Sequence, residues 1–316
     1  MKDASVDAVP VVLDGVRTPP FHALSATRGR RATTRVADYV ELAKPRLNVL
    51  VVATSAAGYY LGSQGTPDLW KMAGAVAGTA LVAGGAAALN QVYERNTDAL
   101  MRRTRSRPVP AGRVPANDAR VFGLMLSALG LGLLALRANG LATALAAATL
   151  LIYLIVYTPM KRRSSLATLV GAVPGALPPV IGWTASHGTV ASGGAVLFAI
   201  VFLWQIPHFM AIAWLYRDDY RLAGFPMLPV IESDGRKTGR QAVVYAAALL
   251  PASLLPTLIG LSGTAYFISA AVLGVGLLGL SIRFARSRND RFARALFLAS
   301  IIYLPLIWLA MMLDKA

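Results

Sequence analysis

Nine apolar stretches follow one another along the chain, separated by short polar connections. Each is close to the roughly 20 residues that a helix needs to cross the hydrocarbon core of a bilayer. This pattern predicts an all-α integral membrane protein with nine transmembrane helices. The predicted spans are about 47–63, 70–90, 118–137, 141–158, 166–184, 193–214, 241–260, 264–282 and 294–312.

The composition supports this interpretation. Of the 316 residues, 56% are apolar and only 15% are charged, whereas a soluble domain averages about 25% charged residues. The net charge of +16 would suit nucleic acid, but the charges lie between the apolar spans, so we expect no nucleic-acid partner. The absence of cysteine excludes disulfides, thiolate metal ligands and a cysteine nucleophile.

The basic residues predict the orientation in the lipid bilayer. They gather before the first span and in the connections after the second, fourth, sixth and eighth spans. Lys71, Arg137 and Lys315 are the exceptions among the 31. Because short cytoplasmic loops carry the excess of lysine and arginine, we predict a cytoplasmic N-terminus and, with nine spans, an external C-terminus. We expect a multi-pass protein of the cell (plasma) membrane whose functional face is cytoplasmic.

The first 36 residues contain no apolar core long enough for a signal peptide. Their prolines and scattered arginines are typical of a mostly disordered basic cytoplasmic tail. We therefore divide the chain into this tail, 1–36, and a membrane domain, 37–316. The membrane domain is expected to begin with a short interfacial helix at 37–46.

Metal-type ligands and arginines are concentrated just after the second span. Asn90, Glu94 and Asp98 are spaced four residues apart, so on a helix they lie roughly along one face. Oxygen ligands of this kind suit Mg²⁺, which shares its shell with phosphate oxygens, and the nearby Arg103 and Arg107 suit the phosphates. The alternative is a solvated helix end with ordinary salt bridges. A polar side chain at the membrane boundary, such as Asn90, is usually functional, so we favour a Mg²⁺–diphosphate site at a membrane face.

A second acidic cluster follows the sixth span. Asp218 and Asp219 are adjacent there, and neighbouring residues on a helix point about 100° apart, so one of the two is expected to face the site. The alternative is a pair of loop aspartates neutralised by Arg217 and Arg221. Because both clusters lie in connections predicted to face the same compartment, we expect them to complete one site.

Basic residues flank the first and fourth spans on the same predicted face. Lys44 and Arg46 precede the first span, and Lys161 and Arg162 follow the fourth. Such residues enforce topology whatever the function. We expect one or two of them to point inward at phosphate, with Lys44 and Lys161 the stronger candidates.

Small residues form one face of the fifth span at 171–176. Such a face usually packs closely against another helix in lipid. It would equally leave room for a flat or elongated hydrophobic ligand.

Together these motifs resemble a known family. The pattern N-x₃-[D/E]-x₃-D-x₂-M-x-R-T-x₂-R-P at 90–108 resembles the first aspartate-rich motif of the UbiA-type membrane prenyltransferases, in the form found in the branch that farnesylates heme. The family more often has Asp where this chain has Glu94, and commonly another acid in place of Asn96. The similarity covers roughly 37–312. Further similar stretches are K-P-R at 44–46, Y-T-P-M-K-R-R at 157–163, G-A-V-P-G-A-L-P-P-V-I-G-W at 171–183, L-W-Q-I-P-H-F at 203–209 and D-D-Y-R-L-A-G-F-P-M-L-P at 218–229.

This resemblance implies nine transmembrane helices around a central cavity that is open to the lipid and capped by the two acidic connections. It implies a Mg²⁺-dependent transfer of the farnesyl group of farnesyl diphosphate to the 2-vinyl group of heme B. Water adds, diphosphate leaves, and the product is heme O for terminal oxidases. Heme B is then a substrate and not a cofactor. A heme A synthase or an oxidase assembly factor is the implied partner.

Particular residues receive roles in this scheme. His208, beside Pro207 in the sixth span, is a candidate heme contact, proton acceptor or hydrogen-bonding group between helices. Tyr153, Tyr157 and Trp204 are candidates, by position, for stabilising an allylic cation through their ring faces. The expected roles of the others are catalysis by Asn90, Glu94, Asp98 and Asp219, metal binding by Asn90, Glu94, Asp98, Asp218 and Asp219, and diphosphate binding by Lys44, Arg46, Arg103, Arg107, Lys161 and Arg162.

Other functions fit parts of the pattern. Within the same family, the acceptor is alternatively a quinone precursor or chlorophyllide, and the R-T-x-x-R-P and P-H-F stretches argue against it. An organic-anion transporter needs access from both sides, whereas the charges here gather on one face and the outer connections are nearly featureless. A non-catalytic heme-binding scaffold is the third alternative.

Overall fold

The computed structural model describes residues 35–316, and their regular elements are helices. The predicted tail, 1–36, falls almost wholly on residues 1–34, outside the described part of the chain. The helices are α1 (Arg35–Leu42), α2 (Pro45–Gly62), α3 (Leu69–Asp98), α4 (Ala116–Arg137), α5 (Gly140–Leu151), the π-helical η1 (Ile152–Tyr157), α6 (Thr158–Met160), α7 (Ala167–His187), α8 (Ala191–Leu215), α9 (Arg217–Leu222), α10 (Leu228–Ile231), α11 (Arg236–Leu258), α12 (Thr264–Ser287) and α13 (Asp290–Leu313).

Within residues 35–316, 8 helices or continuous helical runs are long and apolar enough to cross a membrane. Each coincides with one of the predicted spans, and the run Gly140–Met160 joins α5, η1 and α6. α2, the counterpart of the first predicted span, is not among them, because Arg46 and Asn48 in its first turns lower its hydropathy. The structure thus confirms a multi-pass, all-α protein, and the ninth crossing stays a prediction.

α3 extends past the predicted end of the second span. It continues to Asp98, so Asn90 and Glu94 lie on the same helix as Asp98. The chain leaves the helix there, and Thr104 folds back so that its Oγ1 donates a hydrogen bond to Asp98 O at 2.8 Å. This hydrogen bond satisfies one of the carbonyls that a helix leaves unpaired at its end.

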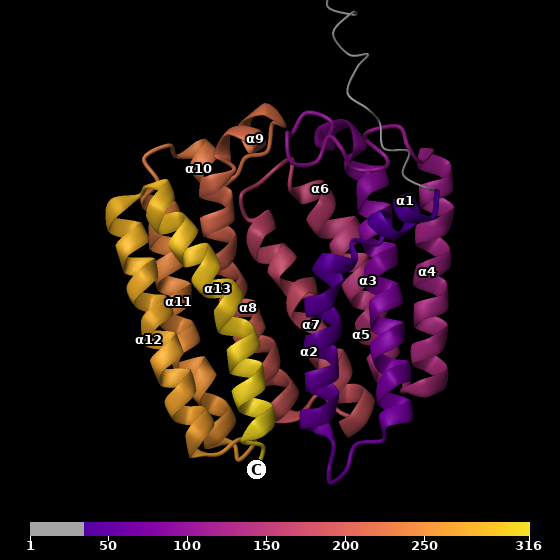
Figure 1. The fold of residues 1–316 in the computed structure, drawn as a ribbon, viewed down its shortest axis with the longest axis vertical. Coiled ribbons are helices and arrows are strands. Elements are labelled where there is room, and N and C mark those ends of the chain that lie inside the picture. The colour runs from indigo at the N-terminus through magenta and orange to yellow at the C-terminus, as the bar shows by residue number, and fades with distance from the viewer. Residues whose placement is uncertain (1–34) are drawn as a thin grey trace, which may run out of the picture. The chain divides into compact units, whose positions relative to one another are not determined.

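Two groups of helices stand side by side in Figure 1. In one group α3 packs on α4 and α2 packs on α7; in the other, α11 packs on α8 and α12, and α13 packs on α8 and α12. The contact between α7 and α8 joins the two groups. The short helices α9 and α10 lie at the same end as α6 and the connection after α3, as Figure 1 shows.

Close packing of α2 on α7 accommodates the prolines inside α7. This helix continues without interruption through Pro174, Pro178 and Pro179. At the contact, a Cβ on Gly58 of α2 would lie only 2.1 Å from Pro179 O, so this approach of the two backbones requires glycine. A neighbouring helix therefore covers the backbone of α7 at Pro179, in agreement with the condition for proline within a membrane span.

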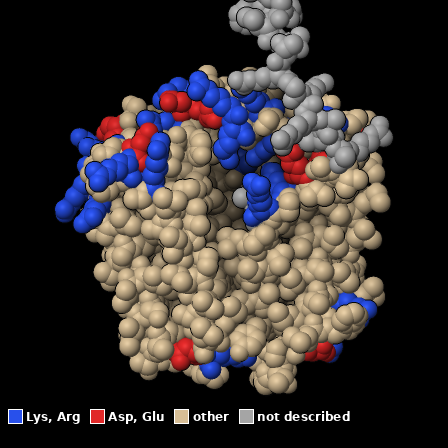
Figure 2. Space-filling model, viewed as in Figure 1, with Lys and Arg blue, Asp and Glu red and all other residues tan. Residues whose placement is uncertain are grey.

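Lysine and arginine side chains gather at the end of the molecule that carries α9 and α10 (Figure 2). Few charged groups lie at the opposite end of the face shown. A hollow bordered by basic residues opens just below the charged end (Figure 2). The one-sided charge agrees with the sequence pattern, and the assignment of this end to the cytoplasm stays a prediction.

Candidate active site

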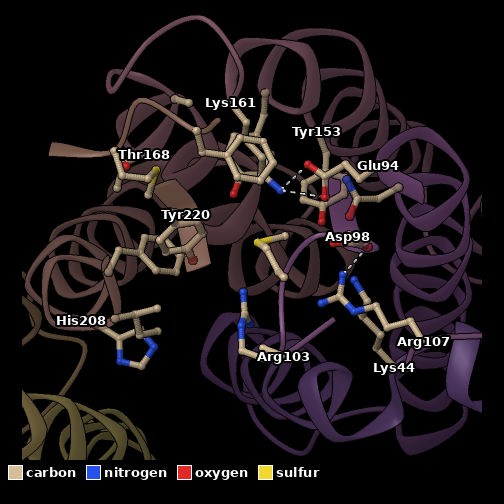
Figure 3. Close-up of a pocket in the computed structure, with 18 residues that line it drawn as sticks. Lys44, Glu94, Asp98, Arg103, Arg107, Tyr153, Lys161, Thr168, His208 and Tyr220 are labelled. Carbon is tan, nitrogen blue, oxygen red and sulfur yellow. Dashed lines mark hydrogen bonds and ion pairs between the residues drawn. The ribbon is translucent and has the colours of Figure 1, made fainter. Parts of the chain in front are cut away.

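A cavity of about 310 Å³ lies at the charged end, between α3, η1, α8 and the connections that follow α3 and α8 (Figure 3). Four cationic side chains and two carboxylates line it, beside aromatic and aliphatic groups. The charged residues are Lys44, Arg103, Arg107, Lys161, Glu94 and Asp98. The excess of positive charge suits an anionic ligand.

One face of α3 supplies the oxygen atoms of this cavity. Asn90, Glu94 and Asp98 line it from successive turns, and they are 1%, 7% and 1% exposed. Asn90 Nδ2 donates a hydrogen bond to Thr158 Oγ1 at 3.2 Å, which orients the amide. The structure thus brings together the three side chains whose spacing placed them on one helix face.

Each of the two carboxylates has a cationic partner, drawn in Figure 3. Lys161 Nζ lies 3.0 Å from Glu94 Oε1 and donates a hydrogen bond to Glu94 Oε2 at 3.3 Å. Arg107 Nη1 donates to Asp98 Oδ2 at 2.7 Å. Because an unpaired buried charge is strongly destabilising, these contacts offset the cost of burying the two carboxylates.

The second oxygen of Asp98, Oδ1, is buried and has no hydrogen-bond partner in residues 35–316. Buried polar atoms are nearly always paired, so an unpaired carboxylate oxygen in a charged cavity indicates a place for a cation. Asn90, Glu94 and Asp98 fit Mg²⁺, which uses few carboxylates and completes its shell with water and phosphate oxygens. In the described part of the chain no three Asp, Glu, His or Cys side chains form a metal-binding group by themselves. The remaining ligands of such an ion would come from water and from the phosphate oxygens of a bound molecule.

The two lysines of the cavity differ in protonation. Burial lowers the pKa of Lys44 to about 7, assisted by the cations Arg107 and Lys161. Burial also lowers the pKa of Lys161, but Tyr157 and Glu94 more than offset this, and its pKa lies above the ordinary value. Lys44 has a left-handed backbone, with φ of 49°, and such strain in a residue other than glycine is concentrated at functional sites.

A second, mostly apolar cavity of about 360 Å³ adjoins the first. The two cavities share Lys44, Tyr153, Tyr157 and Phe209 as lining residues. Both tyrosines belong to η1, and π-helical turns are rare and frequent at functional sites. Lys161 Nζ lies 4.4 Å from the centre of the Tyr157 ring. The two tyrosines therefore lie between the charged cavity and the apolar cavity.

The small residues of α7 make room for the side chains of this wall. A Cβ on Gly171 would lie 2.4 Å from the Tyr157 ring, and one on Gly175 would lie 2.1 Å from Gln205 Oε1. Both glycines also line the apolar cavity. The two interpretations of this stretch, close packing and room for a ligand, are thus combined in one wall.

The connections that follow α3 and α8 meet beside the cavity. Met101 from the first connection packs in one buried cluster with Ala223 and Phe225 from the second. The guanidinium of Arg103 lies 5.3 Å from the centre of the Tyr216 ring. These contacts bring the two acidic clusters to the same end of the molecule, as the sequence predicted.

The adjacent aspartates of α9 point in different directions. Asp219 Oδ2 accepts a hydrogen bond from Arg103 N at 3.4 Å. Asp218 is 76% exposed in its side chain and pairs with Arg221 at 2.7 Å, whereas Arg217 pairs with Asp290. Neither aspartate lines the cavity. Their predicted role in metal binding stays a prediction, and the structure favours Asp219 over Asp218.

Three other predicted site residues lie outside the lining of both cavities. Arg46 and Arg162 are exposed. Trp204 is buried, and its Nε1 donates to Ser300 O at 2.8 Å. His208 does line the charged cavity.

Some residues of the site were not singled out in the sequence. Tyr220 lines the charged cavity, and Thr158 accepts the hydrogen bond that orients Asn90. Both belong to motifs that were noticed for their charges, Y-T-P-M-K-R-R and D-D-Y-R, and the hydroxyl groups inside these motifs were the available signal. Burial raises the pKa of Tyr220, so its hydroxyl stays protonated. Thr168, near the start of α7, had no signal in the sequence.

Comparison with known proteins agrees with the motifs. The model of the UbiA prenyltransferase family matches residues 51–304. A protein named protoheme IX farnesyltransferase from Solibacter usitatus is 46% identical over 287 residues, which cover 88% of this chain and 98% of that protein.

Solved structures resemble the fold. The structure of a digeranylgeranylglyceryl phosphate synthase is similar with a TM-score of 0.74 at 19% identity, over 88% of this chain and 98% of that one. A UbiA homologue from Archaeoglobus fulgidus, bound to GPP and Mg²⁺, is similar with a TM-score of 0.61 at 16% identity, over 87% and 99% of the two chains.

Proposed function

Because the chain belongs to the UbiA prenyltransferase family, we propose that it transfers the farnesyl group of farnesyl diphosphate to the 2-vinyl group of heme B. Water adds in the same reaction, and the products are heme O and diphosphate. The relative named protoheme IX farnesyltransferase, 46% identical to this chain, supports heme as the acceptor over a quinone precursor or chlorophyllide.

The observation that carries the proposal is Asp98 Oδ1, a buried carboxylate oxygen without a hydrogen-bond partner in a cavity that four cations line. Asn90, Glu94 and Asp98 would hold Mg²⁺, and Asp219 of α9 would support the site through its hydrogen bond with Arg103 N. The Archaeoglobus fulgidus homologue, bound to GPP and Mg²⁺, supports this pairing of metal and prenyl diphosphate. When bound, Mg²⁺ offsets the negative charge that builds on the departing diphosphate.

The cationic side chains bind the diphosphate in this scheme. Arg107 and Lys161 each hold a carboxylate in the structure, and a diphosphate offers them acceptors of higher charge. The guanidinium group forms two parallel hydrogen bonds with such oxygens, and the lysine ammonium acts as a point charge. Lys44 and Arg103, which have no ion pair with a carboxylate among the described residues, complete the anion site. Donors placed beforehand around the leaving group lower the barrier for its departure.

The apolar cavity suits the farnesyl chain, because it excludes water from the allylic carbon. The bond between this carbon and the diphosphate oxygen breaks, and the vinyl group of heme forms the new carbon–carbon bond. Water then adds to the cation left on the vinyl group and loses a proton. Tyr153 and Tyr157 line both cavities, so their ring faces are placed to stabilise the allylic cation.

The site belongs on the cytoplasmic face of the plasma membrane in this proposal, because the basic end of the protein carries it and basic ends stay inside. Heme O is consumed by enzymes that modify heme or insert it into oxidases. A heme A synthase or an oxidase assembly factor is therefore the expected partner.

A membrane assay tests the proposal. Membranes that contain the protein are incubated with heme B, farnesyl diphosphate and Mg²⁺, and pigments are identified by mass. Heme O and free diphosphate in equal amounts are expected, with both lost on chelation of Mg²⁺. Prenylation of a quinone precursor or chlorophyllide in place of heme would contradict the acceptor. Uptake of an organic anion into proteoliposomes without release of diphosphate would contradict the enzyme.

A further inference from the structure

The imidazole of His208 is held by two stacked aromatic rings and by a contact at one nitrogen. On its own helix α8 it stacks with Trp204, the ring centroids 5.1 Å apart, and it stacks with Phe297 of α13 at 5.2 Å. Its Nδ1 lies 2.8 Å from Ser300 Oγ, also on α13. The ring therefore has one orientation in the fold.

The other ring nitrogen, Nε2, is open. No hydrogen bond within residues 35–316 uses Nε2, and Nε2 is not one of the unpaired polar atoms that the protein encloses. Because His208 lines the charged cavity, Nε2 is the atom that this ring offers to a molecule there. Figure 3 shows the ring across the view from Glu94 and Asp98.

The hydrogen bonds of Ser300 determine which nitrogen of His208 carries the proton. Ser300 Oγ lies 2.6 Å from Phe297 O, and a carbonyl oxygen only accepts, so the single hydroxyl hydrogen is donated there. Towards His208, Ser300 Oγ is then an acceptor, and Nδ1 must be the donor. In the neutral imidazole Nδ1 carries the N–H and Nε2 carries the lone pair.

We propose that Ser300 is a positioning residue that holds His208 in the tautomer whose Nε2 lone pair binds the iron of the heme substrate. This inference rests on the proposed function, in which heme is the acceptor. Metal-binding histidines generally donate their other N–H to a partner that fixes the ring and its tautomer, and Ser300 takes that place. Iron is then held from α8, across the cavity from the carboxylates of α3 that would hold Mg²⁺, and this orients the porphyrin.

Heme binding by the purified full-length protein in detergent tests this inference apart from turnover. Affinity is measured by absorbance titration with heme, and the iron–histidine vibration of the ferrous complex by resonance Raman spectroscopy. In Ser300→Ala we expect heme affinity to fall about 10–100-fold and the vibration to shift, as is typical when the partner of a metal-binding histidine is removed. Ser300→Thr keeps the hydroxyl and should restore both readouts.

Ser281→Ala is the matched control. Ser281 is fully buried like Ser300, but its hydroxyl donates only to Leu277 O of its own helix, at 2.9 Å. This variant should leave both readouts unchanged. His208→Ala should lose the iron–histidine vibration, and added imidazole should restore it.

Parental heme affinity and an unshifted vibration in folded Ser300→Ala would overturn the positioning role. If Ser300→Ala does not fold, Ser300→Cys provides the same comparison, because a thiol fills the space and accepts hydrogen bonds weakly. Heme O formation by a parent protein whose ferrous complex lacks the vibration would overturn this inference and leave the proposed function intact. The parent protein could instead show the iron–histidine vibration, and His208→Ala could lack it, while the parent makes no heme O. This result would contradict the proposed function.

Discussion

The acidic cluster at the end of α3 and the one on α9 look alike in the sequence but differ in burial. Glu94 and Asp98 are 7% and 1% exposed and line the cavity. Asp218 has a side chain that is 76% exposed and pairs with Arg221 on the surface. Both clusters nevertheless lie at the same end of the helices (Figure 1).

The difference follows from the helices that carry the clusters. α3 has 30 residues and packs along α2 and α4, so its last turns stay among other helices. α9 has only 6 residues. A carboxylate among helices loses its water and needs a cation as partner, whereas an exposed pair contributes only about 0–1 kcal/mol. Substitutions should therefore have large effects on α3 and small effects on α9.

Asp98→Asn should have the largest effect. The substitution keeps the shape of the side chain but removes the charge that would hold Mg²⁺, so we expect farnesyl transfer to fall about 10²–10³-fold, the range typical of losing one electrostatic group in an active site. The initial rate of heme O formation measures it. Asp218→Asn is the control, because it makes the same chemical change on the exposed cluster. Activity of Asp98→Asn within twofold of the parent would contradict the metal assignment.

Arg107→Gln should have the second-largest effect. Arg107 pairs with Asp98 and lines the cavity, and we expect the KM for farnesyl diphosphate to rise about 10-fold or more, because a charge-assisted contact with phosphate is lost. Heme affinity should stay near that of the parent. The control is Arg105→Gln, an exposed arginine in the same connection. An equal loss of both affinities would indicate a role in folding.

The pH dependence of diphosphate binding should reveal the loss of the proton from Lys44. Because burial lowers its pKa to about 7, Lys44 is a cation below this pH and neutral above it. The affinity for farnesyl diphosphate should therefore fall as pH rises through 7, by at most about tenfold between pH 6 and pH 8, following the protonated fraction. Equilibrium binding measures it. In Lys44→Arg the side chain stays charged, so this step should disappear; its persistence would assign the step to another group.

Asp219→Asn and Asp218→Asn provide the finest comparison. Asp219 holds the backbone of Arg103 at 3.4 Å, and Asp218 is engaged with Arg221 outside the cavity. We expect Asp219→Asn to reduce farnesyl transfer about tenfold, at the lower end of the range for groups that orient an active site, and Asp218→Asn to change it by less than twofold. If Asp218→Asn reduced farnesyl transfer more than Asp219→Asn, Asp218 would be the aspartate that supports the site.

Much of the fold followed from the sequence, because membrane-spanning helices are determined by the length and hydropathy of single segments. The spacing of Asn90, Glu94 and Asp98 predicted one helix face, and α3 shows it. The direction in which each basic side chain points was harder to predict. Lys44 and Lys161 line the cavity while Arg46 and Arg162 do not, because the direction of each side chain depends on the turn at which its helix begins or ends.

The sequence was sufficient for properties that reside in one segment: the long apolar helices, the basic end, and the residue types suited to magnesium and phosphate. Tertiary packing was needed to show which polar groups are buried together. Asn90 meets Thr158 and His208 meets Ser300 across separations of 68 and 92 residues. The physical reason is that burial decides whether a charge remains hydrated or needs a partner. Burial, in turn, depends on helices that are distant in the chain, and so the two similar acidic clusters came to differ.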